Sequence, residues 1–358
     1  MRIAFFMGGL ETNGGIGRVV SLVSSGLAEK NEICIICFRP HNPQNSLYNT
    51  DPRVKVDSLN YTGSMKSYLI HGGLRKLNNY LRKKDIEILI ACGALFFPAS
   101  IIACHLTKKK CICWEHSNAN NSADHSFQMI CRRIGARHAD AVVVLTKQDE
   151  KLFLEKYRMK RIIQIYNPVD ERVKYGYQTR VNPKRIISVG RLTYQKNYPL
   201  LIEVAKDVLR KHPEWIWDIY GEGPDHTEIE KLIKEAKLTD QLILKGQVNN
   251  LYGLYRQYSF YVITSRYEGF SMAMLEANRT GLPIISFDVE CGPREIIEDG
   301  VNGYLIPALD FDLMAKRVNE LCNNRAKCLE MSENIRNKHN QFSLKSIVDQ
   351  WNQLFQQL

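Results

Sequence analysis

The sequence predicts an α/β protein built from two Rossmann-like units in tandem, each a parallel sheet covered by helices on both faces. Three observations lead to this prediction. The 358 residues are more than one hydrophobic core usually organises. Short Val/Ile-rich runs alternate with longer segments of helical period, which is typical of buried parallel strands. The alternation stops at a polar, irregular stretch from 171 to 183 and then restarts.

The first unit begins with a strand, a glycine-rich turn and a helix. The helical sequence GRVVSLVSSGLAEK places four apolar side chains on one face: Val19, Leu22, Val23 and Leu27. Further strands are expected at 33–38, 86–92, 110–115 and 141–146, and the segment 161–170 closes this half. The second unit repeats the pattern, with strands expected at 184–190, 215–221, 242–246, 260–264, 283–287 and 303–307.

Four of these strands run into loops that are rich in glycine and in polar or charged residues. IAFFM runs into GGLETNGGIG, ISVG into RLTYQKN, DIYG into EGP, and VIT into SRYEGFS. Ligands of parallel α/β sheets bind beyond the carboxyl ends of the strands. A purely structural fold does not require four such strand ends, so the sequence predicts a ligand site there.

Composition narrows the class of protein further. No apolar run approaches the 18 residues that a membrane-spanning helix needs, and the amino terminus lacks the features of a signal peptide. The ten cysteines lie mostly on apolar strands, whose neighbouring positions do not converge on a tetrahedral metal site. We therefore expect buried free thiols and a reducing cytoplasm.

The loop GGLETNGGIGRV does not fit the dinucleotide pattern G-x-G-x-x-G, because Val20 stands where the last glycine would be. Close backbone approach at a helix start still suits a phosphate or sugar oxygen, although a tight βα turn is the alternative. In VGRLTYQKN, Arg191 and Lys196 are cations that could neutralise a diphosphate without a metal. The alternative is two solvated loop cations. YGEGP, from Tyr220 to Pro224, offers a backbone ledge that suits a nucleobase, but taken alone this signal is weak.

The stretch SRYEGFSMAMLEA carries two carboxylates, Glu268 and Glu276, with seven residues between them. Ser271 is a plausible N-cap, so a helix should begin near Met272 and leave Glu268 in the preceding loop. Gly269 allows close backbone approach to a ligand, and Glu276 lies one turn into the helix. Both carboxylates can then reach one hydroxyl-rich ligand; the alternative is a capped helix with one stray glutamate.

With these motifs in place, the sequence resembles the retaining glycosyltransferases of family 4, which have the GT-B fold. EGFSMAMLE matches their E-x7-E signature, and GGIG, GRLTYQKN, YGEGP, EGFS and GPREIIEDGVNGYLIP follow in the family's order across nearly the whole chain. The resemblance implies two Rossmann-like domains facing each other across a cleft. Residues 1–168 would bind the acceptor and residues 169–342 the nucleotide-sugar donor, while a last helix, 343–358, would cross back onto the first domain.

The resemblance also implies roles for single residues. Arg191 and Lys196 would clamp the diphosphate, Glu268 with the amides of Gly269, Phe270 and Ser271 would contact the donor sugar and phosphate, and Glu276 would accept from the ribose. His116, in CWEHSN, would lie near the transferred sugar, although a lone strand-end histidine is structural about as often. The other expected donor-binding positions are Gly15 near the β-phosphate, Asn167 at the hinge, Gly190, Glu222, and the backbone of Tyr220 and Val248 at the base.

The function implied is retaining transfer of a hexose or N-acetylhexosamine from a nucleotide sugar, most simply UDP-linked. The acceptor would be a glycan, lipid-diphosphate-linked, in capsule, O-antigen or exopolysaccharide synthesis. We expect no metal or other cofactor, because this family uses no D-x-D site and FDVE, with Asp288 and Glu290, is not one. A non-hydrolysing sugar-nucleotide epimerase and a non-catalytic nucleotide-sugar-binding protein are the alternatives.

The net charge of +11 is uneven along the chain. Residues 1–170 carry 24 Lys and Arg against 14 Asp and Glu, whereas the remainder carries 25 against 24. The stretch GGLRKLNNYLRKKD sets Leu74, Leu77 and Leu81 at helical spacing, with cations around them that include Arg75, Lys76, Arg82, Lys83 and Lys84. This pattern favours a peripheral enzyme on the anionic cytoplasmic leaflet. An ordinary surface helix docked by its leucines is the alternative, and nucleic acid is disfavoured because the sugar-nucleotide motifs need no such partner.

Overall fold

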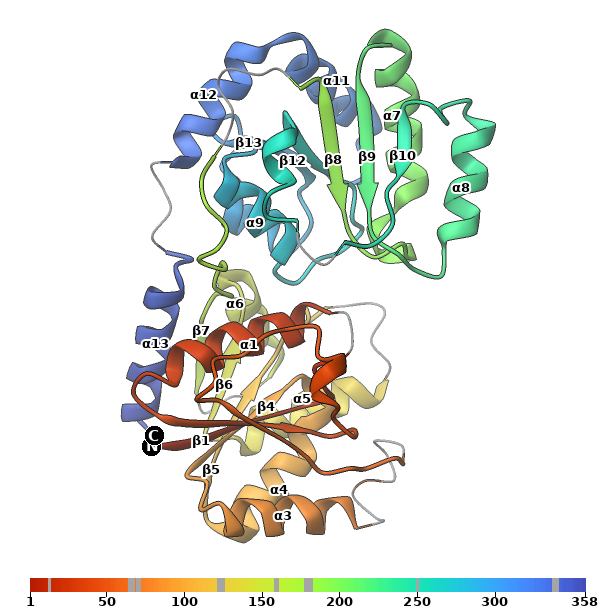
Figure 1. Ribbon diagram of the computed structural model, residues 1–358. Coiled ribbons are helices and arrows are strands. Elements are labelled where there is room, and N and C mark those ends of the chain that lie inside the picture. Colours follow the sequence, from red (N-terminus) through yellow and green to blue (C-terminus); the bar gives the residue numbers. More distant parts are fainter. Residues whose placement is uncertain are drawn as a thin grey trace. The chain divides into compact units, whose positions relative to one another are not determined.

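The computed structural model describes residues 1–11, 14–63, 68, 72–120, 126–157, 161–176, 183–248, 251–336 and 341–358. Residues 12–13 of the glycine-rich loop and 177–182 of the irregular stretch therefore lie outside the described residues. The chain divides into two compact units, Met1–Pro168 with Phe342–Leu358, and Val169–Gln341. Each unit is a parallel sheet with helices packed on it, which confirms the predicted fold class (Figure 1).

The sheet of unit 1 has the strand order β3-β2-β1-β4-β5-β6-β7. Its strands are β1 Arg2–Met7, β2 Glu32–Cys37, β3 Lys55–Ser58, β4 Ile88–Cys92, β5 Lys110–Trp114, β6 Ala141–Val144 and β7 Ile162–Gln164. The sequence predicts all of these except β7, which falls in the segment 161–170 that was expected only to close this half, and β3. Strand β3 is short and only half-buried, so it has no apolar run, and it forms because it pairs with β2 at the edge of the sheet.

The helices of unit 1 pack on both faces of this sheet (Figure 1). They are α1 Gly15–Leu27, α3 Gly73–Lys83, α4 Phe97–Thr107, α5 Ser126–His138, α6 Lys147–Lys156 and α13 Leu344–Gln356, with 3₁₀ turns η1 Pro43–Asn45 and η2 Ala94–Phe96. In α1 the predicted apolar face is confirmed for Val19, Val23 and Leu27, which are buried, whereas Leu22 is half-buried. One core joins alternate residues of the strands to α3, α4, α5 and α6.

The last helix, α13, completes unit 1 from the far end of the chain. It begins after Ser343, whose hydroxyl accepts from the amide of Ser346 at 3.2 Å. It packs on α1, where a Cβ added to Gly26 would lie 2.6 Å from the side chain of Val348. Trp351 is fully buried, and its ring lies edge-on to that of Trp114 at the end of β5, with centroids 4.9 Å apart.

Unit 2 has six strands in the order β10-β9-β8-β11-β12-β13. They are β8 Arg185–Val189, β9 Ile216–Tyr220, β10 Leu242–Leu244, β11 Phe260–Ile263, β12 Ile284–Phe287 and β13 Gly303–Ile306. All six coincide with predicted strands. The helices are α7 Tyr198–Lys211, α8 His226–Glu235, α9 Met272–Thr280, α10 Pro293–Ile296, α11 Phe311–Asn323 and α12 Arg325–Arg336, with 3₁₀ turns η3 Tyr194–Lys196 and η4 Tyr255–Gln257.

Two predictions drawn from composition can be compared with the fold. All ten cysteines are free; nine are buried and Cys322 is partly buried, which confirms the expected buried thiols. No helix in the described part of the chain combines the length and the apolar character needed to cross a bilayer.

Candidate active site

Two of the predicted loops of unit 2 are joined by hydrogen bonds at the carboxyl ends of β8 and β11. The amide of Arg266 donates to the carbonyl of Gln195 at 2.8 Å, and the Gln195 side chain donates to the carbonyl of Tyr267 at 3.0 Å. The hydroxyl of Thr264 donates to the carbonyl of Lys196 at 3.1 Å. The loops that carry Lys196 and Glu268 are therefore held together as one piece.

Lys196 and Glu268 form an ion pair, with Nζ and Oε1 2.5 Å apart. Both side chains are largely buried, at 13% and 6% exposure. Gly190 makes room for the lysine, because an added Cβ would lie 2.9 Å from Cε and 3.1 Å from Cδ of Lys196. Sequence reasoning gave the two residues separate roles and missed this pairing. Arg191 is exposed on the same loop.

Glycines pack four loops of unit 2 backbone against backbone. At Gly221, where φ is +145°, an added Cβ would lie 1.9 Å from the carbonyl oxygen of Gly190, and at Gly223 it would lie 2.2 Å from that of Leu192. At Gly292, where φ is +97°, it would lie 2.4 Å from the carbonyl oxygen of Gly269. No other residue fits these three positions without moving a neighbouring backbone. The motifs YGEGP and CGPRE thus support the loops that carry Arg191 and Glu268.

The YGEGP motif, expected to offer its backbone to a nucleobase, is partly occupied by contacts within unit 2. The Tyr220 side chain is buried, and its hydroxyl lies 2.9 Å from that of Tyr258. The carbonyls of Tyr220 and Glu222 accept from the amides of Gly190 and Leu192, each at 3.0 Å. The Glu222 side chain and part of Val248 are exposed, and Val248 is followed by residues 249–250, which lie outside the described residues. A base contact at this ledge stays a prediction.

Helix α9 begins at Met272, as predicted, with Ser271 at the N-cap. The Ser271 side chain makes no capping hydrogen bond, although its carbonyl accepts from the amide of Leu275 at 3.0 Å. The first amides of a helix have no acceptor within the helix, and together with the helix dipole they favour an anion. This helix start follows Gly269 and Phe270, and a phosphate contact there stays a prediction.

The two glutamates of the E-x7-E signature, Glu268 and Glu276, are both buried, which the sequence did not predict. Glu276 is fully buried in α9 and Glu268 is 5% exposed. Burial raises the pKa of the Tyr261 phenol on β11 well above its ordinary value, and the negative charges of Glu268 and Glu276 raise it further. The negative charges of both carboxylates therefore act on the same buried phenol.

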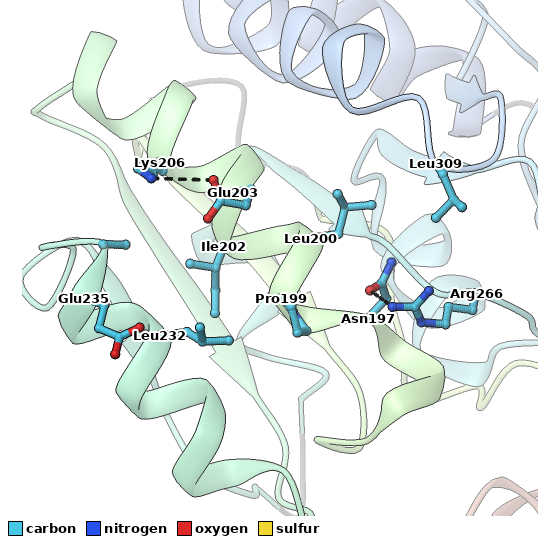
Figure 2. A pocket seen from close by; sticks show the side chains of 11 residues that line it. Asn197, Pro199, Leu200, Ile202, Glu203, Lys206, Leu232, Glu235, Arg266 and Leu309 are labelled. Carbon is cyan, nitrogen blue, oxygen red and sulfur yellow. Dashed lines mark hydrogen bonds and ion pairs between the residues drawn. The ribbon is translucent and has the colours of Figure 1, made fainter.

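Arg266 also links the loop that carries Lys196 to the loop that carries Glu268. Its guanidinium carbon lies 4.4 Å from the centre of the Tyr194 ring, and Nη2 donates to Oδ1 of Asn197 at 2.7 Å. Figure 2 shows this Arg266–Asn197 bond at the edge of a pocket of about 500 Å³ between α7 and α8. The other lining residues include Pro199, Leu200 and Leu309. None of the predicted donor-binding residues lines this pocket.

In unit 1, the predicted His116 lies directly after β5. Its ring is 4.5 Å from that of Trp114, and Nε2 is buried without a hydrogen-bond partner among the described residues. Burial lowers the pKa of His116 to about 3, so the imidazole is neutral at physiological pH. Glu115 shapes the loop, because Oε1 accepts from the amides of His116 and Ser117, and Oε2 pairs with the buried Arg132 at 2.8 Å.

The glycine-rich loop is held by Tyr48. Gly15 is the first residue of α1, and Gly14 precedes it in extended backbone. The Tyr48 hydroxyl donates to the Gly14 carbonyl at 3.0 Å, and its ring would touch a Cβ added to Gly17 at 2.8 Å. Asn167, the expected hinge residue, is buried next to the boundary of the unit, and no described residue bonds its Oδ1.

Sequence reasoning missed several residues that shape these loops. Tyr194 and Arg266 lie inside the motifs RLTYQKN and SRYEGFS, so the sequence already places an aromatic ring and a cation in the two loops that pack together. Tyr48 and Arg132 lie outside any motif, and only the tertiary fold brings them to the glycine-rich loop and to Glu115.

Comparison with known proteins identifies the family of this chain. The family description "Glycosyltransferase Family 4" matches residues 13–173, and "Glycosyl transferases group 1" matches residues 171–338. The amylovoran biosynthesis glycosyltransferase AmsD of Erwinia amylovora is 26% identical, over 89% of this chain and 90% of its own. The poly(ribitol-phosphate) alpha-N-acetylglucosaminyltransferase of Staphylococcus aureus is 32% identical, over 62% of this chain and 44% of its own.

Among solved structures, a TarM variant of S. aureus, crystallised with fondaparinux, alpha-GlcNAc-glycerol and UDP, superposes with a TM-score of 0.85. It is 20% identical, and the match covers 99% of this chain and all of the other. This likeness establishes the fold, and the two family matches together span nearly the whole chain. The chain belongs to the glycosyltransferases with the GT-B fold, with a family 4 region followed by a group 1 region.

Proposed function

We propose that this glycosyltransferase moves a hexose or N-acetylhexosamine from a UDP-sugar to a growing glycan, with retention of configuration. The acceptor we propose is a lipid-diphosphate-linked glycan of a bacterial surface polysaccharide. Relatives named for amylovoran and poly(ribitol-phosphate) chemistry support this substrate class. The observation that carries the proposal is the buried Lys196–Glu268 pair, held beside Arg191 and ahead of the start of α9.

The chemistry we propose is cleavage of the bond between the sugar and the diphosphate. Negative charge grows on the leaving diphosphate, so preorganised cations and amides lower the barrier most. Arg191, Lys196 and the amides that begin α9 would supply them. Because Gly190 and Glu268 already fix the lysine, little reorganisation is needed when the donor binds. We propose that these groups replace a metal ion and that turnover needs no divalent cation.

Retention is supported by the pairing of Glu268 and by a relative's product. A carboxylate that is buried and paired with a lysine is poorly placed to act as a nucleophile, which favours same-face attack. In that reaction a phosphate oxygen of the leaving diphosphate accepts the proton of the attacking hydroxyl. The S. aureus relative is named an alpha-transferase, which fits retention because UDP-N-acetylglucosamine is itself α-linked.

We further propose a peripheral location on the cytoplasmic leaflet. The cations of α3 support it, because Arg75, Arg82 and Lys83 are exposed. The leucines of α3 do not, because Leu77 and Leu81 are fully buried in the core of unit 1. The alternative considered from the sequence is thus correct for the leucines: they dock the helix rather than face a membrane.

A panel of UDP-sugars tests the proposed function. We expect slow release of free sugar and UDP from one donor, unchanged in excess EDTA, and at least a hundredfold slower with Arg191→Ala. Interconversion of two UDP-sugars would identify an epimerase instead, and tight binding without turnover would identify a sensor. A requirement for Mn²⁺ or Mg²⁺ would contradict metal independence but not the proposed transfer reaction.

A further inference from the structure

Two neighbouring helices of unit 1 carry an exposed apolar surface. Ten large hydrophobic side chains are exposed among the described residues, and half of them lie on η2, α4 and α5: Leu95, Ile102, Leu106, Met129 and Ile130. Leu106 and Ile130 are 52% and 51% exposed. The two helices pack together where Phe97 meets Gly135, whose added Cβ would lie 2.7 Å from the ring. Scattered single residues need no explanation, but this concentration does.

The three helices that form this side of unit 1, α3, α4 and α5, carry no acidic residue themselves, and the nearby Asp57 and Asp85 are paired with cations. Arg133 and Arg137 are exposed on α5 and form no hydrogen bond or ion pair with any described residue. Helix α3 adds Arg75 and Lys83, and Arg82 links it to α4 by donating to the carbonyl of Leu106 at 3.4 Å. By contrast, the following helix of this unit, α6, carries three acidic residues.

We propose that the exposed side of α3, α4 and α5, here called the three-helix surface, docks the protein on an anionic lipid bilayer. This inference rests on the proposed peripheral location and names the residues that produce it. Ile102, Leu106, Met129 and Ile130 enter the boundary between headgroups and acyl chains, and Arg133 and Arg137 lie at the phosphates. The absence of acidic side chains matches the negative charge of such a membrane rather than a neutral protein surface.

Flotation of the full chain with vesicles separates the contribution of the cations from that of the apolar side chains. We expect binding to phosphatidylglycerol vesicles at low salt and weak binding to phosphatidylcholine vesicles. Arg133→Gln with Arg137→Gln should weaken the low-salt binding by roughly fivefold per cation, or about 30-fold together. The matched control replaces Lys231 and Lys234, two exposed lysines of α8, with glutamine and should bind like the parent.

The apolar contribution has its own variant and control. Ile102→Gln with Ile130→Gln should remove most of the binding that survives at high salt, because screening weakens only the charge contribution. Leu154→Gln, on the 56% exposed leucine of α6, removes a similar apolar side chain and should leave binding intact. All four substituted proteins should retain parental release of UDP in solution, so a failed UDP-sugar assay and a failed flotation assay are distinguishable.

Two results would overturn the proposal. One is parental flotation by both the arginine and the isoleucine variants. The other is absence of flotation with phosphatidylglycerol vesicles at low salt. If light scattering then shows a dimer that Ile102→Gln with Ile130→Gln dissociates, the three-helix surface is an interface between copies of the chain.

Discussion

The Lys196–Glu268 pair predicts strong energetic coupling between two side chains 72 positions apart in the sequence. Lys196→Met leaves a buried carboxylate without the cation that lies 2.5 Å away, which costs about 3–5 kcal/mol. Because Lys196 keeps 13% exposure, we expect the lower end, about 3 kcal/mol. In a unit of this size, that lowers the midpoint of thermal unfolding by about 6–12 °C.

The second substitution should restore much of this loss. Lys196→Met combined with Glu268→Gln leaves no buried charge, so the double variant should be more stable than the sum of the single effects by about 2–3 kcal/mol. Urea and thermal unfolding of the four proteins measure the coupling. Arg191→Ala is the matched control, because this exposed cation of the same loop should change stability by less than about 1 kcal/mol. Additivity within about 0.5 kcal/mol would refute the reasoning.

Three further predictions concern the site. Glu276→Gln should mainly weaken UDP binding, because ribose is common to donor and product, whereas Glu268→Gln should spare UDP and slow transfer; equal affinity losses in calorimetry would contradict this division. Tyr194→Leu should lower kcat about fivefold, because it removes the ring beneath Arg266, whereas Tyr194→Phe keeps the ring and should keep kcat. Equal kcat in the two variants would show that the Arg266–Tyr194 contact does not support the site. As pH falls from about 6.5 towards 3, the parent should lose unfolding free energy relative to His116→Asn, because the unfolded chain binds a proton that the folded chain resists. Parallel pH profiles would contradict the neutral imidazole.

Local periodicity explains how much of the fold was predictable. Eleven of the thirteen strands follow from apolar runs, since a strand buried on both faces must be apolar along its length, whereas β7 is a half-buried edge strand. The start of α9 follows from a serine ahead of an apolar helix. Strand β3 lacks such a run, because it lies at the edge of the sheet and is only half-buried, so only its pairing partner defines it.

The candidate site was predictable as a set of loops but not as a set of contacts. The motif order identified Lys196 and Glu268, but their ion pair depends on how two distant loops pack, which spacing does not encode. Likewise, helical spacing in α3 showed a leucine face without showing whether protein or solvent covers it. The exposed residues of α4 and α5 gave no periodic signal, because their exposure depends on the helices beside them.

The position of α13 has a consequence for synthesis of the chain. Unit 2 is a continuous segment, whereas unit 1 needs residues at both ends of the sequence. A ribosome therefore synthesises all of unit 2 before it synthesises the last helix of unit 1. Until then, Trp114 and the α1 surface around Gly26 lack the cover that Trp351 and Val348 provide. The nascent protein therefore carries this open apolar face while the whole of unit 2 is synthesised, which makes the face a natural binding site for chaperones.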